Sequence, residues 1–273
     1  MLQLDALIQT VPPHLRQDRS DCEAYRIFAE DLLRELRQFI GAVRFGFAGF
    51  SMLGDGGLGV LSGLLKTASD LGYYVLLDLP EVHSQLAAQA VADTLKKENT
   101  MFACDGMVIS CYAGSDVIKP FLDLCKTGKS LFPVVRTANK TATEVQDLLT
   151  GARLVHTAVA DVVNRHAEGV PGKGGYCQVG AVAAASSADS LRNLRSKYKR
   201  MFFILDGYDY PNSNAKNCSF AFDAFGHGAA ACAGTSIAAA WQDAGSDGTD
   251  FTQQAVEAAE RMKKNLTRYI TVL

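Results

Sequence analysis

The sequence predicts an α/β fold, a (β/α)8 TIM barrel that spans residues 1–273 as one domain and has a weak or missing first strand. Three observations support this prediction. Short apolar runs alternate with segments of helical periodicity, and the runs recur at intervals of roughly 25 to 45 residues, as in βαβ units. The chain length also matches the typical barrel of about 250 residues.

Seven apolar runs, most of them rich in valine, isoleucine, phenylalanine and tyrosine, are the predicted strands. They cover residues 43–50, 73–79, 106–112, 131–137, 176–182, 201–207 and 228–234. Because a closed barrel needs eight strands, the first strand must lie within residues 1–20, where only the short stretch "LDALIQTV" is a candidate. An open doubly wound sheet is the alternative, but no glycine-rich phosphate loop follows the earliest strand.

The segments between the strands show helical spacing of apolar residues. In "AYRIFAEDLLRELRQFI", residues Tyr25, Phe28 and Leu32 return every three or four positions. The other predicted helical segments are residues 60–72, 84–97, 116–126 and 144–166. The loop at 207–220 is the longest polar stretch and is interpreted as a binding loop or a surface connection.

Composition excludes several classes of protein. A net charge of -2 provides no bulk attraction to nucleic acid or to an anionic membrane, so we expect neither as a partner. No apolar run approaches membrane-spanning length. The seven cysteines are scattered without a C-x-x-C pair, which predicts reduced thiols in a cytoplasmic protein. No histidines and acids occur at metal-ligand spacing, so we expect no metal and no cofactor.

Several consecutive segments resemble one family, the longer bacterial branch of the orotidine 5'-monophosphate decarboxylases. Residues 21–80 are similar to the family's first helix, lysine-bearing strand and second βα unit. "CYAGSDVIKPFLD" resembles its Tyr-Met-Gly-x-Asp-x-x-x-Pro-Phe segment, and "LFPVVRTANKTATEVQDL" resembles its Thr-Ser-Asn strand end. The resemblance implies a TIM barrel, a carboxy-lyase of pyrimidine (UMP) biosynthesis and a homodimer.

The chain departs from the family's catalytic motif, Asp-x-Lys-Arg-Gly-Asp. The matching run begins at Asp78, places Pro80 at the position of the proton-donating lysine and ends at His83. The lysine of the preceding strand is replaced by Arg44, which does not readily give up a proton. Whether the chain is an enzyme therefore stays open at this stage.

The substrate-binding motifs depart in the same way. The family's pyrimidine-contacting serine is Ala138, although Asn139 persists. The phosphate loop contains Asp206 and Asp209, and the phosphate-binding arginine is Thr235. Carboxylates repel a phosphate dianion where a bidentate arginine attracts it. No first-strand aspartate for the ribose is recognisable.

Three residues are the catalytic candidates. Asp78 and His83 form a possible acid–base pair, and Arg44 supplies charge beside them. The competing interpretation is structural: Asp78 is a leftover acid, and Pro80 and Ser84 start a helix. A buried arginine needs an acid or an anion, so Asp78 or Asp206 is expected to neutralise Arg44 with an internal ion pair.

A small-molecule ligand at the carboxyl ends of the strands would meet a further set of residues. Tyr112, Asp116 and Asn139 follow from the family motifs, Arg136 ends a strand, and Tyr208 and Tyr210 are the candidates for stacking on a planar ligand. His156 and His166 are interpreted as packing or surface residues.

Three functional hypotheses remain. The first is a catalytically degenerate homologue that acts by binding or regulation. The second is an enzyme with altered chemistry that uses Asp78, His83 and Arg44. The third is a functional decarboxylase with an unrecognised arrangement, in which Lys140 or Lys119 is the proton donor.

Overall fold

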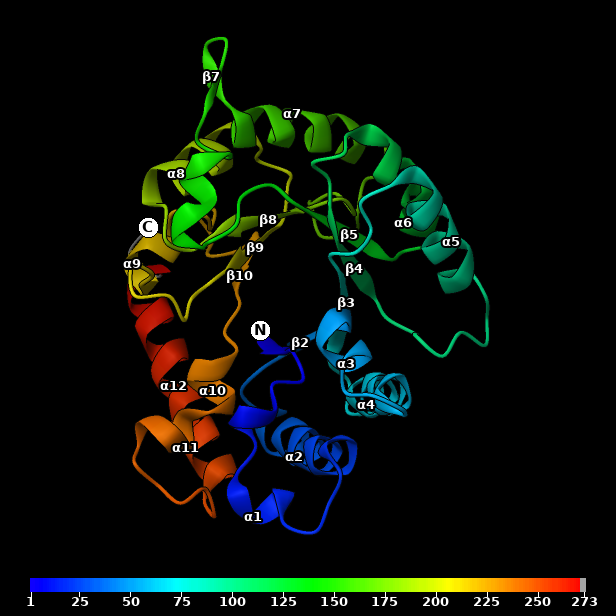
Figure 1. The fold of residues 1–273 in the computed structure, drawn as a ribbon. Coiled ribbons are helices and arrows are strands. Elements are labelled where there is room, and N and C mark those ends of the chain that lie inside the picture. The colour runs from blue at the N-terminus through cyan, green and yellow to red at the C-terminus, as the bar shows by residue number, and fades with distance from the viewer. Residues whose placement is uncertain (271–273) are drawn as a thin grey trace. The chain divides into compact units, whose positions relative to one another are not determined.

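The computed structural model describes residues 1–270, along which strands and helices alternate (Figure 1). Within these residues, eight strands form one parallel sheet in the order β1-β2-β3-β4-β5-β8-β9-β10. The strands are β1 (Leu2–Leu4), β2 (Ala42–Gly46), β3 (Tyr74–Leu79), β4 (Gly106–Ser110), β5 (Ser130–Val134), β8 (Ala181–Ala184), β9 (Phe203–Asp206) and β10 (Ala229–Ala231). A strand order that follows the chain, with helices between the strands, is the (β/α)8 topology, so the predicted fold class is confirmed.

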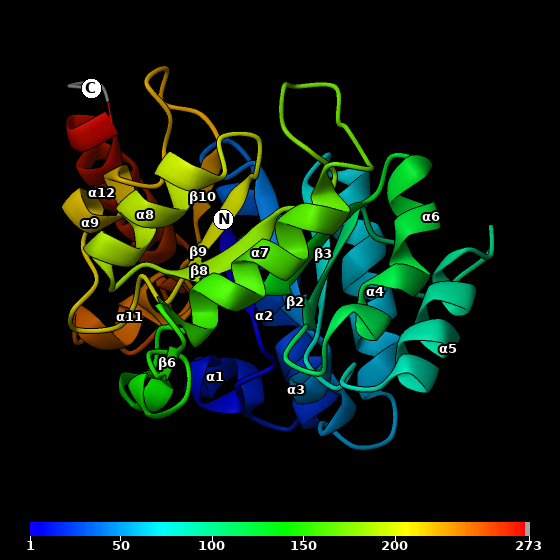
Figure 2. The ribbon, with the colours of Figure 1, turned by 90° about the horizontal axis from the view of Figure 1, so that it is seen from above.

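Helices fill the segments between the strands. They are α1 (Pro13–Arg16), α2 (Asp21–Leu36), α3 (Phe47–Ser51), α4 (Gly57–Asp70), α5 (Gln85–Leu95), α6 (Leu122–Lys126), α7 (Val155–Ala167), α8 (Ala188–Lys197), α9 (Ala215–Ser219), α10 (Thr235–Ala238), α11 (Ala240–Asp243) and α12 (Phe251–Ile270). Four short 3-10 turns add η1 (Ile8–Thr10), η2 (Ser115–Val117), η3 (Lys119–Phe121) and η4 (Lys140–Glu144) to the described part of the chain. Figures 1 and 2 show α5, α6, α7 and α8 on the outer side of β4, β5, β8 and β9.

The first strand is present but short, in agreement with the expected weakness. It lies at Leu2–Leu4, ahead of most of the "LDALIQTV" candidate, whose later residues form η1 instead. Leu2 pairs with Val43 of β2 on one side and with Ala233 on the other, so β1 has a neighbour on both sides. Three paired residues suffice because Leu2 and Leu4 are fully buried.

Several of the predicted segments are wrong in detail. The run 176–182 overlaps strand β8 only at its last two residues, and the helix predicted over 116–126 consists of two 3-10 turns and the short α6. The apolar run 43–50 is a strand only as far as Gly46, and α3 begins at Phe47. The predicted helix over 144–166 is interrupted by a hairpin of β6 (Leu149–Thr150) and β7 (Arg153–Leu154), which projects beyond α7 in Figure 1. Gly151 turns this hairpin with a φ of 65°, a conformation that suits glycine. Short apolar runs do not distinguish helix from strand by periodicity alone.

The chain divides into two compact units. Unit 1 comprises Met1–Asp78, Asn99–Asp105 and Ala233–Lys264, and unit 2 comprises Leu79–Glu98, Gly106–Cys232 and Asn265–Leu273. The expected single domain stays a prediction.

Unit 1 is organised around an aromatic core. The ring of Tyr25 contacts those of Phe28 and Phe50 edge-on, at centroid distances of 5.9 and 5.5 Å, and Phe50 contacts Phe45 at 6.1 Å. Edge-to-face pairs of this kind add to the free energy gained from burying the rings. Ser20 starts α2, because its hydroxyl accepts a hydrogen bond from the Glu23 amide. The core therefore holds α2 against β2.

One arginine joins several segments at the amino ends of the unit 2 strands. The Arg195 guanidinium of α8 donates to the carbonyls of Ala221, Tyr198, Lys199, Met201 and Gly228. It also lies over the ring of Phe203, 4.6 Å from the centroid. Arg195 thus joins the turn before β9 to the turn before β10.

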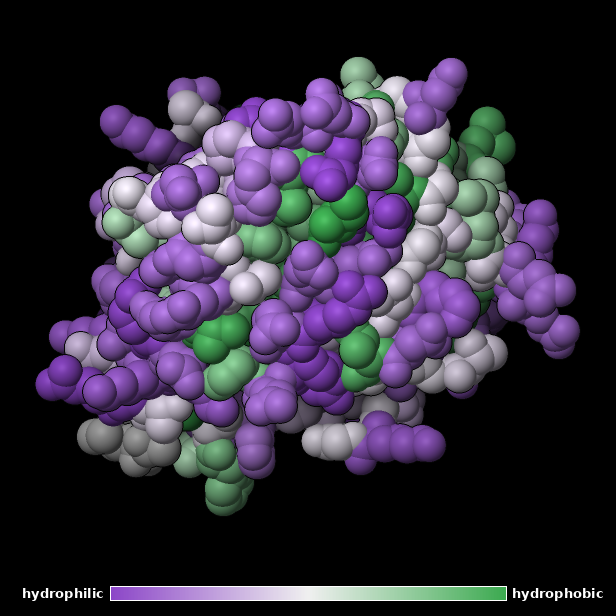
Figure 3. All heavy atoms as spheres, turned by 90° about the horizontal axis from the view of Figure 1, so that it is seen from below, coloured by the Kyte–Doolittle hydropathy of each residue, from purple (hydrophilic) through white to green (hydrophobic). Residues whose placement is uncertain are grey.

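In the part of the chain that the structure describes, no helix combines the length and the apolar composition needed to cross a membrane. Figure 3 shows one face of the molecule, on which polar and charged residues predominate and apolar residues are scattered. Scattered apolar side chains are normal on a protein surface and mark no site by themselves.

Replacing Arg195 tests its bridging role. Arg195→Met should lower the free energy of unfolding by about 2 to 4 kcal/mol, because carbonyls that accept from a charged donor lose that donor. Urea denaturation measures the change. Arg165→Met, at an exposed position on α7, is the matched control and should change little. Equal effects of the two substitutions would contradict the bridging role.

Candidate functional site

The carboxyl ends of barrel strands carry functional residues, and in unit 1 they hold a buried ion pair. Gly46 of β2 pairs in register with Asp78 of β3. The Arg44 Nε and Nη2 atoms lie 2.9 and 2.5 Å from Asp78 Oδ2, and the two side chains are only 6% and 12% exposed. The internal ion pair that the sequence predicted is therefore present, with Asp78 as a partner of Arg44.

An aspartate also follows the first strand in unit 1. Asp5 comes directly after β1 and accepts a hydrogen bond of 2.7 Å from Gln3 Nε2. A Cβ atom on Gly46 would lie only 2.3 Å from Asp5 Oδ1, so the close approach requires glycine at the end of β2. Asp5 lies inside the candidate stretch 4–11, and it was not recognisable as a strand-end residue because the strand begins two residues before that stretch.

The cavity beside Asp5 is small. It has a volume of about 20 Å³ and is lined by residues that include Asp5, Tyr25 and Thr235. A space of this size holds about one water molecule. The cavity is therefore too small for a nucleotide.

His83 lies in the loop before α5 and is exposed. Ser84 is the N-cap of this helix, since its hydroxyl accepts from the Ala87 amide at 3.2 Å. Pro80 is exposed in the turn that precedes it. These contacts explain the residues around His83 by helix initiation, and catalysis by Asp78 and His83 stays a prediction.

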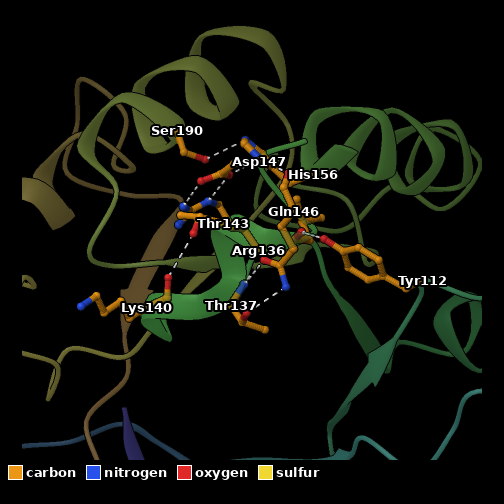
Figure 4. A network of polar contacts seen from close by, with 10 residues as sticks. Tyr112, Arg136, Thr137, Lys140, Thr143, Gln146, Asp147, His156 and Ser190 are labelled. Carbon is orange, nitrogen blue, oxygen red and sulfur yellow. Dashed lines mark hydrogen bonds and ion pairs between the residues drawn. The ribbon is translucent and has the colours of Figure 1, made fainter. Parts of the chain in front are cut away.

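In unit 2, a chain of polar contacts begins at Arg136, just after β5 (Figure 4). Arg136 Nε and Nη2 donate to the two carboxylate oxygens of Asp147 at 3.1 and 2.7 Å. His156 Nδ1 lies 3.1 Å from Asp147 Oδ1, and its Nε2 lies 3.3 Å from the Ser190 hydroxyl. The segment after β5 is thus connected to helix α7 through Asp147, and to helix α8 through His156.

The order Asp147, His156, Ser190 resembles a nucleophilic triad, but its surroundings are structural. Ser190 and His156 are 8% and 4% exposed, and Arg136 already neutralises Asp147. His156 Nδ1 also lies 3.0 Å from the Gln146 carbonyl. Because both partners of Nδ1 are acceptors, that nitrogen carries the proton and Nε2 accepts from Ser190 in the neutral ring.

A second set of contacts holds the segment after β5. The Thr137 amide donates to Gln146 Oε1 and Gln146 Nε2 donates to Thr137 Oγ1, both at 2.9 Å. The Tyr112 hydroxyl donates to the Val135 carbonyl at 2.7 Å. The segment 138–148, defined here as the β5 loop, is therefore tied back to the strand end from which it leaves.

The remaining predicted ligand residues are dispersed over unit 2. Asp116 accepts from Lys119 Nζ at 2.9 Å in an exposed pair. Asn139 is exposed and donates to Thr141 Oγ1 at 3.0 Å. Both contacts are local, between residues two or three positions apart, and the binding role of Asp116 and Asn139 stays a prediction.

The two tyrosines after β9 differ in burial. Tyr208 is half-buried, and burial raises the pKa of its phenol. Tyr210 is 47% exposed, and its ring lies against Gly207: a Cβ atom there would be 2.6 Å from Tyr210 Cδ2 and 2.2 Å from Ala138 Cβ. Tyr210, Gly207 and Ala138 thus come together at the carboxyl ends of β5 and β9.

Arg136 and burial determine the charge states of two neighbouring polar residues, Asp147 and Tyr112. Hydrogen bonds from that guanidinium hold the pKa of Asp147 below its usual range, against the effect of partial burial. Burial raises the pKa of Tyr112, so its phenol stays neutral over the physiological range. The Asp147 carboxylate is therefore neutralised by Arg136, and the neighbouring Tyr112 phenol is neutral.

Comparison with known proteins places the chain beside one group of enzymes. It is 25% identical to the orotidine 5'-phosphate decarboxylase of Rhodopirellula baltica over 83% of this chain and 78% of that protein. It is 21% identical to the enzyme of the same name from Caldicellulosiruptor bescii over 98% of this chain and 93% of that protein. No family model matches the chain.

Solved structures agree on the fold. A protein of Toxoplasma gondii, described as an orotidine-monophosphate-decarboxylase, superposes with a TM-score of 0.81 at 22% identity, covering 99% of this chain and 92% of that one. The Leishmania donovani OMP decarboxylase gives a TM-score of 0.72 at 21% identity, covering 97% and 92%. The barrel fold is therefore shared with these proteins.

The buried pair in unit 1 should dominate local stability. Asp78→Asn or Arg44→Met should each lower the free energy of unfolding by about 3 to 5 kcal/mol, because each breaks a buried charge pair by removing one partner. The double substitution Arg44→Met/Asp78→Leu should recover much of that loss. Urea denaturation of all three variants measures this. Losses that simply add in the double variant would contradict a direct pair.

Asp147 should make stability depend on pH. Its folded-state pKa is lowered, so its contribution is present above the ordinary carboxyl pKa near about 4 and is lost as pH falls through the lowered value. The destabilisation by Asp147→Asn should therefore be largest near neutral pH and shrink towards about pH 3. Denaturation across that range measures it, with the exposed Asp189→Asn as control. A pH-independent difference would contradict the assignment.

Proposed function

We propose that this homologue of the orotidine 5'-phosphate decarboxylases does not decarboxylate orotidine 5'-monophosphate and acts by binding, as a regulator or partner in pyrimidine nucleotide metabolism. The single observation that carries the proposal is the Arg44–Asp78 ion pair. By resemblance, Asp78 is the one acid that the chain retains from the catalytic motif. Its carboxylate is bound to a buried guanidinium of the same unit.

The missing proton donor supports the same conclusion. By resemblance, the catalytic lysine position is Pro80, which has no ionisable group. Decarboxylation of this substrate class needs roughly 20 kcal/mol of transition-state stabilisation, near the upper end of enzyme catalysis. Arginine cannot replace lysine as a proton donor, because its pKa stays far above neutral pH.

The phosphate end of the motif also argues against the nucleotide as a substrate. Asp206 ends β9 and Asp209 follows three residues later, where the resemblance places a phosphate loop. Thr235, at the position of the phosphate-binding arginine, starts the four-residue helix α10. A neutral hydroxyl offers none of the charge-assisted bidentate contacts of an arginine.

The proposed binding role uses the carboxyl ends of the unit 2 strands. Tyr210 is partly exposed beside Ala138, and Thr137 keeps the first position of the Thr-Ser-Asn segment. Aromatic rings at a strand end suit a planar ligand. We also propose that the chain is a homodimer, as the family resemblance implies.

The alternative is a working decarboxylase with Lys140 or Lys119 as proton donor. Lys119 is exposed, and its ammonium lies 2.9 Å from the Asp116 carboxylate. Lys140 is exposed at the start of η4. Neither residue has the burial that tunes a lysine for proton transfer.

The test is turnover of orotidine 5'-monophosphate by the purified chain, followed by the absorbance change on loss of the carboxylate. We expect no rate above that of buffer, while the orotidine 5'-phosphate decarboxylase of Clostridium acetobutylicum serves as the positive control. Asp78→Asn and Lys140→Ala are assayed in parallel. Turnover that either substitution abolishes would overturn the proposal and favour the alternative.

A further inference from the structure

We propose that residues 5–12, defined here as the strap, form a conformational switch in unit 1: strain at Ala6 opposes the closed position of the strap, and contacts with α2 and α11 hold it closed. The strap leads from β1 to α1, as Figure 1 shows in dark blue. When closed, it narrows the cavity beside Asp5, and its release would open that cavity to molecules larger than water. The switch is independent of the binding role proposed above, which uses unit 2.

Ala6 is the strained residue of the strap. Its φ of 54° lies in the left-handed region, which a residue with a Cβ atom rarely adopts and which costs free energy. Such a conformation persists only where the surrounding contacts impose it, and it is frequent in clamps and switch regions. Ala6 is 7% exposed, and its amide donates to the Tyr25 hydroxyl of α2 at 3.1 Å. Burial and this hydrogen bond therefore oppose the strain.

Three glycines leave room for the two ends of the strap. A Cβ atom on Gly49 of α3 would overlap the Asp5 carbonyl oxygen, and one on Gly46 would overlap the Asp5 carboxylate. The third glycine, Gly248, lies at the other end, where a Cβ atom would be 2.7 Å from Pro12 Cβ. Because Cβ atoms do not approach other atoms so closely, the closed strap requires glycine at these positions. A methyl group at Gly49 would therefore displace the strap.

The far end of the strap is anchored to α11. The Trp241 indole N–H donates to the Thr10 carbonyl at 3.0 Å, and Gln242 Nε2 donates to the Gln9 carbonyl at 2.6 Å. Trp241 is 8% exposed, and it is the only tryptophan in the sequence. Its fluorescence therefore reports on the strap without an added label.

The strap also forms part of the wall of the cavity beside Asp5. Asp5, Leu7 and Thr10 line the cavity from the strap, and its other lining residues include Tyr25 of α2 and Thr235 of α10. The volume of about 20 Å³ holds about one water molecule. Because three strap residues line so small a space, the position of the strap determines what can enter it.

Hydrogen–deuterium exchange of the intact chain tests the switch. Gly49→Ala should raise the exchange rate of the strap amides about tenfold, because the added methyl group excludes the closed position, and should leave β3 unchanged. Tyr25→Phe keeps the ring and removes only the hydroxyl that accepts from Ala6, so it should act in the same direction if Gly49→Ala folds poorly. Ala6→Gly should slow strap exchange about threefold, because relief of the strain exceeds the larger entropy loss of glycine.

Two substitutions are the matched controls, and neither should change strap exchange. Gly59→Ala adds the same methyl group in α4, at a position with no atom within 4 Å of the new Cβ. Asp18→Gly removes a side chain from another residue with positive φ, outside the strap. Acrylamide quenching of Trp241 fluorescence is the second readout, since acrylamide is larger than water. It should increase in Gly49→Ala and Tyr25→Phe and stay unchanged in both controls.

A folded Gly49→Ala or Tyr25→Phe protein with unchanged strap exchange or unchanged quenching would overturn the switch. Faster exchange throughout unit 1 would also overturn it, because the strap would then unfold only together with the core of that unit. Strap exchange that Ala6→Gly leaves unchanged or accelerates would overturn the role of strain. Turnover of orotidine 5'-monophosphate would contradict the proposed function and leave these readouts untouched, so the two failures are distinguishable.

Discussion

A buried guanidinium must be neutralised, and in each unit of this chain a carboxylate of the same unit neutralises a buried arginine. Arg44 is paired with Asp78 in unit 1, and Arg136 is paired with Asp147 in unit 2. An unpaired buried charge costs several kcal/mol, so neither carboxylate can be withdrawn without disturbing the strand end around it. Both arginines therefore bind carboxylates of their own unit. In unit 2 the same pair fixes the far end of the β5 loop and orders His156 behind it.

The fold was predictable because its signals are local. Apolar runs bounded by turns placed seven of the strands, and β1 was missed as a convincing strand because three residues are too few for a periodic pattern. The helix predicted over 144–166 failed for the opposite reason. Its apolar spacing continues through Leu148 and Leu149, yet Gly151 turns the backbone and both leucines are exposed. Periodicity describes which residues are apolar, and it cannot show that a hairpin leaves them outside the core.

The site was predictable only where register determines contacts. Arg44 and Asp78 lie on neighbouring parallel strands, and Asp78 was one of the two carboxylates, with Asp206, that the sequence offered as partners of Arg44. The sequence did not predict that the segment after β5 contacts Asp147, Gln146 and His156. A single helix over 144–166 would not return these residues to that strand end. Asp147 lies eleven residues after Arg136, and it reaches Arg136 only because the β5 loop folds back towards the end of β5. The available signal was the pair of buried-strand arginines itself, since each requires an acid.

Retention of a motif residue is also different from retention of its role. Thr137 survives from the Thr-Ser-Asn segment, but both of its polar groups are paired with Gln146. The neighbouring serine position is Ala138, whose Cβ lies so close to Gly207 that this glycine cannot carry a side chain. A larger residue at 138 would press on Gly207 and on the Tyr210 ring that covers it. Packing thus favours alanine at position 138, while the hydrogen bonds that close the loop account for Thr137.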